Sequence, residues 1–353
     1  MTRPIPGRVA PGPRRLPGAS ALKQQPATAR IAVDLLGGDH APDVVVDGAL
    51  RACQADPALQ LLLVGPVEAA RAVLDALDPE QRPRVTALAA PADRADLVGI
   101  PRQRTPETVW DRRAGIESGV RAAVLAVAQG QADAVVSAGN TGATVTSAAL
   151  GLGRWPGVRR PALAAVLPTK AGRLVLLDAG ASVDPDEETL AVHAAVGAAY
   201  AMVVHGTDAP RVGLLTIGTE DGKGDRLRRA AANVLAAAPL PGRARYSGPV
   251  EGNDVVLGGA ADVVVTDGFT GNVLLKGLET AYALIGTPPA ERTVPVPPRA
   301  AVLLGVAGTV VVCHGAADAI DLAGGIAFAA HLHRRAAVAA IAELIQPGVV
   351  HDQ

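Results

Sequence analysis

The stretch Asp262-Val-Val-Val-Thr-Asp-Gly-Phe-Thr-Gly-Asn-Val-Leu-Leu-Lys276 decides the fold class of this chain of 353 residues. Its β-branched run predicts a buried strand, and a glycine-containing turn and the start of a helix follow. The free N–H groups and the positive end of such a helix favour an anion. Gly268 and Gly271 let the backbone approach a ligand, and Asn272 is predicted to cap the helix. Lys276, one turn further on, could reach the same anion, although the pattern also fits a plain structural corner.

The composition indicates a large α/β protein of a reducing compartment. Apolar residues make up 49% of the chain and aromatic residues 2%, so the predicted core consists of Ala, Val and Leu. The net charge of −1 argues against nucleic acid as the main partner. The two cysteines, Cys53 and Cys313, indicate neither a disulfide framework nor a metal cluster. We therefore expect a cytoplasmic protein.

The first 29 residues differ in kind from the rest. They are rich in proline, contain no acid and carry the basic residues Arg3, Arg8, Arg14, Arg15 and Lys23. They are predicted to be a disordered tail, with a weak contact to an anionic membrane surface as the alternative. Residues 30–353 are predicted to form a single domain with a proline-rich break at 287–298. No stretch fits a transmembrane helix; one of the best candidates, Ala301–Cys313, is too short and is broken by glycine.

From Arg30 onward, short β-branched runs alternate with Ala-rich helical patterns, which predicts a mainly parallel sheet with helices on both faces. The predicted strands are Ile31–Leu35, Gln60–Val64, Arg84–Leu88, Ala134–Ser137, Leu163–Leu167, Leu174–Asp178, Val212–Ile217 and Val263–Thr266. The predicted helices include Asp43–Ala55, Val67–Leu77, Gly119–Gln129, Asp186–Val204 and Arg226–Ala237. Ligands of such folds gather at the carboxyl ends of the strands, so the loops that follow them could converge on one site.

The first of these loops contains a double glycine and two polar side chains. Gly37 and Gly38 form a turn after the first predicted strand, and Asp39 and His40 follow where a ligand would lie. The alternative is that Asp39 caps the turn and His40 is merely exposed.

The second loop repeats the pattern of strand, glycine turn and helix start. It reads Ser137-Ala-Gly-Asn-Thr-Gly-Ala143. Asn140 or Thr141 is expected to cap the helix, and the free N–H groups near Gly142 would then face a phosphate. Because its composition mirrors Thr270-Gly-Asn272, the sequence predicts two anion-binding helix ends in one sheet.

Two further loops carry acidic or basic candidates. Asp178 ends a predicted strand and is a candidate for ligand binding, whereas Asp184 is predicted to cap the helix that follows. The polar loop 218–224 contains Lys223, which could contact an anion or simply be solvated.

Several familiar signatures of catalysis are absent from the sequence. No G-x-G-x-x-G follows the first strand, and neither a P-loop nor a G-x-S-x-G elbow is present. His331 and His333 lie on opposite sides of a predicted helix, which makes a poor metal pair. We therefore expect no cofactor and no metal, and backbone suited to anions without an evident covalent nucleophile.

Taken together, these loops resemble the bacterial acyl-[acyl carrier protein]:phosphate acyltransferases of phospholipid synthesis. The resemblance implies a three-layer α/β/α fold akin to isopropylmalate dehydrogenase and phosphotransacetylase. It also implies a homodimer at the membrane periphery that makes acyl phosphate from an acyl carrier protein thioester and inorganic phosphate. The motifs that carry it are Val33–Pro42, Ser137–Ala143, Arg160–Leu163, Leu177–Asp184, Gly213–Glu220, Val264–Val273 and His314–Asp318, in the family's order.

This resemblance suggests a mechanism that fits the residues. Phosphate is already an anionic nucleophile, and a thiolate whose thiol has a pKa of about 8.5 leaves readily, so positioning matters more than a proton relay. We expect phosphate or the oxyanion to be held by Asn140–Gly142 and by Thr270–Asn272, with charge from Lys276 or Lys223. His40 would protonate the departing sulfur. The candidate catalytic residues are therefore His40, Asp267 and Lys276.

The chain also departs from the family pattern. Arg113–Gly119 stands where the family carries Lys-Lys followed by Ser-Ser, and the proline-rich segment 287–298 stands where the family has a long helical hairpin. Two alternatives follow: a paralogue that uses another acyl thioester, such as one of coenzyme A, and a non-catalytic module that binds carrier protein. A dehydrogenase on the related fold is disfavoured because its arginine-rich clamp and metal-binding aspartates are not evident.

Overall fold

The computed structural model describes residues 28–90, 119–220, 222–286 and 298–349. Three predictions fall on other parts of the chain. The tail 1–29, the stretch 113–119 and the break 287–298 lie outside the described residues, apart from their last one or two residues.

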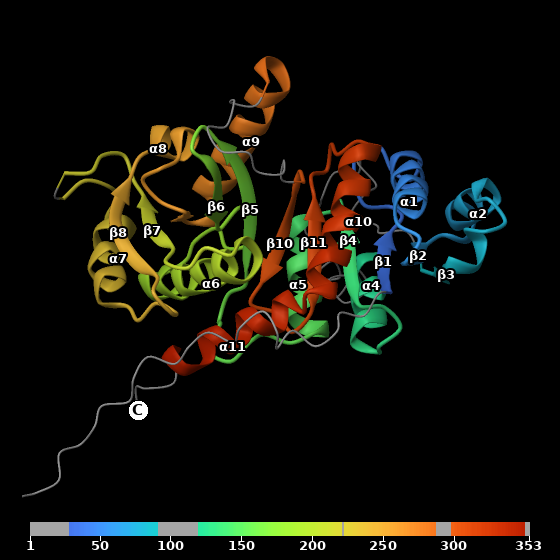
Figure 1. The fold of residues 1–353 in the computed structure, drawn as a ribbon, viewed down its shortest axis with the longest axis horizontal. Coiled ribbons are helices and arrows are strands. Elements are labelled where there is room, and N and C mark those ends of the chain that lie inside the picture. Colours follow the sequence, from blue (N-terminus) through green and yellow to red (C-terminus); the bar gives the residue numbers. More distant parts are fainter. Residues whose placement is uncertain (1–27, 91–118, 221, 287–297, 350–353) are drawn as a thin grey trace, which may run out of the picture.

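The fold is built on a single sheet of 11 strands in the order β3-β2-β1-β4-β11-β10-β5-β6-β9-β7-β8 (Figure 1). The strands are β1 Ala29–Asp34, β2 Leu59–Gly65, β3 Val85–Ala89, β4 Ala134–Ser137, β5 Ala162–Thr169, β6 Gly172–Leu177, β7 Arg211–Leu215, β8 Arg245–Val250, β9 Val263–Val265, β10 Ala300–Leu304 and β11 Thr309–Cys313. The helices are α1 Asp43–Ala55, α2 Val67–Ala76, α4 Gly119–Ala128, α5 Thr141–Gly151, α6 Glu187–His205, α7 Arg226–Ala237, α8 Gly252–Leu257, α9 Gly268–Ile285, α10 Ala319–Arg334 and α11 Ala337–Val349, with a 3₁₀ turn η2 at Arg82–Arg84.

The sheet reverses direction near its middle. Strands β3, β2, β1, β4 and β11 run parallel to one another. Strand β10 is antiparallel to β11 and β5, and β5 is antiparallel to β6. Strands β6, β9, β7 and β8 are again mutually parallel. The carboxyl ends of β1 and β4 therefore lie at the opposite edge from those of β6, β9 and β7. The loops that could converge on one site therefore do not all lie at the same edge.

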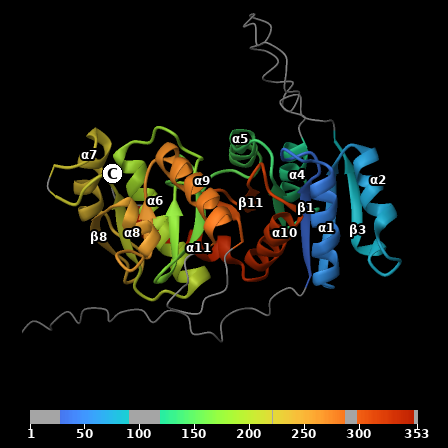
Figure 2. The same ribbon diagram turned by 90° about the horizontal axis from the view of Figure 1, so that it is seen from above.

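Helices cover both faces of the sheet, which gives the three-layer α/β/α fold (Figure 2). Because side chains alternate along a strand, each strand contributes to both layers of core. In β6, Val175 and Leu177 pack in the cluster that includes α1, α6, α10 and α11. Leu174 and Leu176 of the same strand pack on the other face with α8 and α9. Helices α4 and α5 complete that second face.

Most elements match the sequence predictions. The eight predicted strands and five predicted helices are present, with boundaries that differ by two residues at most. Strands β8, β10 and β11 were not predicted, and the apolar stretch Ala301–Cys313 forms the antiparallel pair β10–β11. The helix predicted to be capped by Asp184 is capped by Asp186, whose carboxylate accepts the Thr189 N–H at 2.9 Å. Among the described helices, none has the length and apolarity needed to cross a membrane.

Candidate active site

Helix α9 begins directly after β9, and Asp267 fixes its first turn. The Asp267 carboxylate accepts the Thr270 N–H at 2.8 Å and the Thr270 hydroxyl at 2.7 Å. The prediction that Asn272 caps this helix is wrong, because the cap precedes the first helical residue, Gly268. At Gly271, an added Cβ would lie 2.0 Å from the Asp178 carbonyl oxygen, so this close approach requires glycine.

The carboxylate of Asp267 is committed to a buried ion pair. Its partner is Arg228, which also donates to the hydroxyls of Thr266 and Thr270. Burial alone would raise the pKa of Asp267, but the hydrogen bonds from Thr270 and the charge of Arg228 hold it below its usual value. Asp267 is 5% exposed and does not line the cavity described below. Its position is that of a structural cap.

Three of the first four N–H groups of α9 are already occupied. Gly268 N donates to the Ser182 carbonyl at 2.8 Å, and Gly271 N donates to the Asp267 carbonyl at 2.9 Å. Thr270 N is taken by the Asp267 carboxylate, whose negative charge also offsets the positive helix end. This helix end therefore offers less to an anion than the sequence suggests.

Asp178 is fully buried and organises the loop after β6. Its Oδ1 accepts N–H bonds from Leu163 at 2.9 Å, Gly180 at 3.0 Å and Ala181 at 2.9 Å, and its Oδ2 accepts one from Ser182 at 2.5 Å. All of these bonds are internal to the protein, so the carboxylate shapes the loop. The Asn272 amide in turn donates to the Ala179 carbonyl at 3.1 Å, which ties this loop to α9.

The start of α5 matches its prediction and leaves backbone donors free. Asn140 caps the helix by accepting the Ala143 N–H at 3.0 Å, as expected. Within the described part of the chain, the N–H groups of Thr141 and Gly142 have no protein acceptor. The turn before them is held by the Ser137 hydroxyl, which accepts the Gly139 N–H at 3.0 Å. This helix end is therefore the better anion site of the two.

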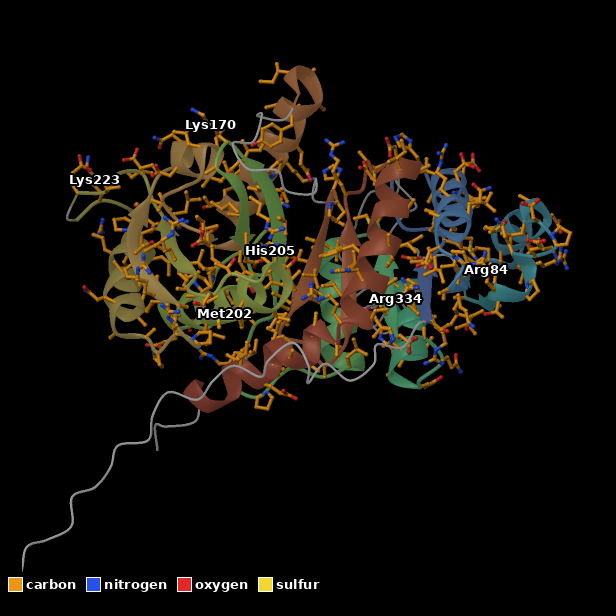
Figure 3. The ribbon with its side chains drawn as sticks, viewed as in Figure 1. Arg84, Lys170, Met202, His205, Lys223 and Arg334 are labelled. Carbon is orange, nitrogen blue, oxygen red and sulfur yellow. The ribbon has the colours of Figure 1, made fainter. Side chains whose placement is uncertain are left out.

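The loop after β1 packs beside this turn. Asp39 N donates to the Gly315 carbonyl at 2.8 Å, and a Cβ added at Gly37 would lie 2.6 Å from Gly139 N. The side chains of Asp39 and His40 are exposed and are not part of the cavity lining. Lys223 is also exposed and lies at the far end of the molecule, beside β7 and β8 (Figure 3).

A cavity of about 610 Å³ lies between α9 and the face of β5, β10 and β11. Loops reach it from both edges of the sheet, since Thr141 follows β4 and Gly180 follows β6. Of the predicted site residues, it brings together Thr141, Gly268, Asn272 and Lys276. Its other polar residues, which the sequence analysis did not assign, are Glu279, Tyr282, Arg299 and His314.

The Lys276 ammonium meets His314 inside this cavity. Lys276 Nζ and His314 Nε2 are 2.5 Å apart. His314 Nδ1 accepts the Ala316 N–H at 3.1 Å, so the proton of the neutral ring sits on Nε2. The two side chains therefore contact each other, and the Glu279 carboxylate, 3.7 Å from Nε2, is too far away to accept a normal hydrogen bond. An anion that bound beside this pair and drew the two groups apart would accept from both.

The remaining titratable groups of the cavity are not suited to nucleophilic attack. Burial raises the pKa of the Cys313 thiol to about 12, so the thiolate is scarce at neutral pH. Burial also raises the pKa of Glu279, against the opposing charges of His314 and Arg299. The cavity therefore offers binding groups for an anion and no activated nucleophile among the described residues.

A signal for some of the missed residues was present in the sequence. Asn272, Lys276, Glu279 and Tyr282 recur at spacings of three and four, which places them on one face of α9. His314 belongs to a family motif but was given no role. Arg299 follows the segment 287–298 and carries no local signal, since only the tertiary fold brings it to α9.

The fold is similar to that of solved phosphotransacylases. It is similar to EutD phosphotransacetylase from Staphylococcus aureus, with a TM-score of 0.57 at 18% identity over 87% of this chain and 95% of that chain. A branched-chain phosphotransacylase from Enterococcus faecalis V583 gives a TM-score of 0.58 at 16% identity over 87% of this chain and 99% of that chain. At such low identity, these similarities establish the fold class.

Sequence comparison then gives the family. A family model described as fatty acid synthesis protein matches residues 29–293. A phosphate acyltransferase from Thermobifida fusca (strain YX) is 42% identical over 355 residues, which cover 94% of each chain. One from Halalkalibacterium halodurans is 41% identical over 258 residues, 71% of this chain and 69% of that one. The chain belongs to the phosphate acyltransferase family and is an acyltransferase, as its motifs predicted.

Proposed function

We propose that this protein transfers an acyl group from an acyl carrier protein thioester to inorganic phosphate. The products are an acyl phosphate and the free carrier thiol. The observation that carries the proposal is the contact between the side chains of Lys276 and His314 in a cavity that Thr141, at the start of α5, also lines. Family membership supports acyl transfer to phosphate, and the carrier protein donor is the finer part of the proposal.

The chemistry follows from these positions. A phosphate oxygen attacks the thioester carbonyl carbon, the C–O bond forms, and the C–S bond breaks to release a thiolate. Lys276, His314 and the start of α5 hold the phosphate and offset its charge, which brings the two reactants into contact. The proton that the thiolate takes up comes from the Lys276 ammonium, which solvent then reprotonates. Because His314 Nδ1 is engaged by Ala316, the ring acts as a fixed donor through Nε2.

This assignment moves the proton donor from His40 to Lys276. The His40 side chain is exposed and outside the cavity lining, whereas Lys276 lies within it. Asn272 is retained as a positioning residue because its amide holds the loop after β6 against α9.

The test is a hydroxamate assay for acyl phosphate with carrier protein and coenzyme A thioesters as alternative donors. Replacing Lys276 with Met removes a charge-assisted hydrogen bond of about 1.5–3 kcal/mol, so the phosphate KM should rise about 10- to 150-fold, or turnover should be lost. Asn272→Ala should also weaken phosphate use. Lys170→Met, at the exposed turn between β5 and β6, is the matched control (Figure 3). Unchanged phosphate kinetics in Lys276→Met would refute the assignment.

A further inference from the structure

The lining residues at the two ends of the cavity differ in how far they are exposed to solvent. At the end nearest the start of α9, the lining includes Val183, Phe269 and Val273, which are 61%, 64% and 59% exposed. That end therefore opens to solvent through an apolar rim. At the other end the lining includes Pro168 and Tyr282, both half-buried.

Tyr282 spans this second end of the cavity. Its hydroxyl donates to the Pro168 carbonyl oxygen at 3.2 Å, so the side chain reaches from α9 to the next-to-last residue of β5. Burial raises the pKa of Tyr282, in keeping with a ring enclosed between the helix and the strand. Because both residues line the cavity, the ring and its hydrogen bond form a wall across it.

The space in front of this wall is suited to an alkyl chain. Leu167, Ala300 and Ala301 line it from the strands. The charged group at this end, Arg299, is turned toward Asp321 at 3.7 Å and donates to the Glu279 carbonyl at 3.2 Å. Tyr282 lies six positions after Lys276 on α9, which corresponds to a rise of about 9 Å. The part of the cavity between these two residues is called the arm below.

We propose that Tyr282 is a specificity-determining residue that sets the longest acyl chain the protein uses well. The inference rests on the proposed function. A thioester enters through the rim of Val183, Phe269 and Val273, its carbonyl stops at Lys276, and its alkyl end extends toward Tyr282. A chain that is too long meets the ring, and its terminal methylenes stay unburied.

The experiment compares acyl thioesters that increase by two carbons, with kcat/KM measured by acyl phosphate formation. Tyr282→Ala removes the wall, and Tyr282→Phe removes only its hydrogen bond. Ala283→Phe adds a ring at an exposed helix position on the same arm. Phe269→Ala, at the open rim, is the matched control for loss of an aromatic side chain.

Burying one methylene raises kcat/KM about 4-fold. In Tyr282→Ala, a thioester two carbons longer than the chain preferred by wild type should therefore have a kcat/KM about 15-fold above that of the preferred chain. Tyr282→Phe and Phe269→Ala should leave the preferred length where it is, and Ala283→Phe should shorten it. An unchanged length profile in folded Tyr282→Ala would overturn the inference. If Tyr282→Ala does not fold, an unchanged profile in Ala283→Phe decides against it. Absence of acyl phosphate with every chain length, in wild type, would instead reject the proposed function.

Discussion

Replacing Arg228 with Met tests how the active-site helix α9 is anchored. Arg228 is 9% exposed and its guanidinium pairs with Asp267, which is 5% exposed. The same group donates to the Thr266 hydroxyl at 2.8 Å and to the Thr270 hydroxyl at 3.1 Å. Methionine keeps the apolar stem and removes the charge, so the Asp267 carboxylate stays buried without its partner.

The free energy of unfolding should fall strongly because only one member of the ion pair is removed. Breaking a buried ion pair in this way typically costs about 3–5 kcal/mol, mostly as the penalty for the charge left behind. The double variant Arg228→Met with Asp267→Asn removes that charge and keeps an acceptor for the Thr270 N–H. It should therefore recover at least half of the loss.

The assay is urea unfolding of the single variants, the double variant and wild type at pH 7, followed by circular dichroism. Arg243→Met, which removes an exposed ion pair with Asp208, is the control and should change the free energy of unfolding by less than about 1 kcal/mol. A loss below about 1 kcal/mol in Arg228→Met, or a double variant no more stable than the single one, would refute the reasoning.

Two further predictions concern titration. Because its pKa is raised to about 12, the Cys313 thiol should resist alkylation by iodoacetamide at pH 7. Double-reciprocal plots of the initial rates against the two substrates should then intersect. Parallel lines would indicate an acyl-enzyme intermediate. Burial, and then the charge of Arg173, lower the pKa of His205 from 6.5 to about 4. The unfolded chain therefore binds the extra proton first, and stability falls as the pH drops from 6.5 toward 4. His205→Gln should lose this part of the pH dependence in urea unfolding; a constant difference from wild type over that range would contradict it.

The sequence predicted local structure well where strand, turn and cap signals agree. Strand β4 was predicted to the residue, and Asn140 was one of the two residues identified as possible caps of α5. At α9 the sequence analysis named Asn272 as the cap, whereas Asp267 caps the helix. Arg228, 39 residues earlier in the chain, lies beside Asp267 only in the folded protein, where it offsets the charge of the capping carboxylate.

The sequence analysis predicted neither the direction of every strand nor the full set of cavity residues. The alternation of strand and helix patterns predicted a mainly parallel sheet, but it did not indicate that β10 and β5 would pair antiparallel with their neighbours. Of the cavity polar residues that were missed, Glu279 and Tyr282 lie on α9 itself. His314 and Arg299 come from the ends of β11 and β10 and lie beside α9 only in the folded chain. Thr141 and Lys276, by contrast, were predicted from their own loops and both line the cavity.

The reversal at β10 has a thermodynamic consequence. The start of α5 belongs to the half of the sheet built on β1, β4 and β11, whereas α9 packs on the half built on β6 and β9. A ligand that contacts Thr141 and Lys276 together bridges these halves across β10. Binding of this ligand then stabilises the contact between the two halves. By thermodynamic linkage, any interaction that holds the two halves together also raises the affinity for this ligand.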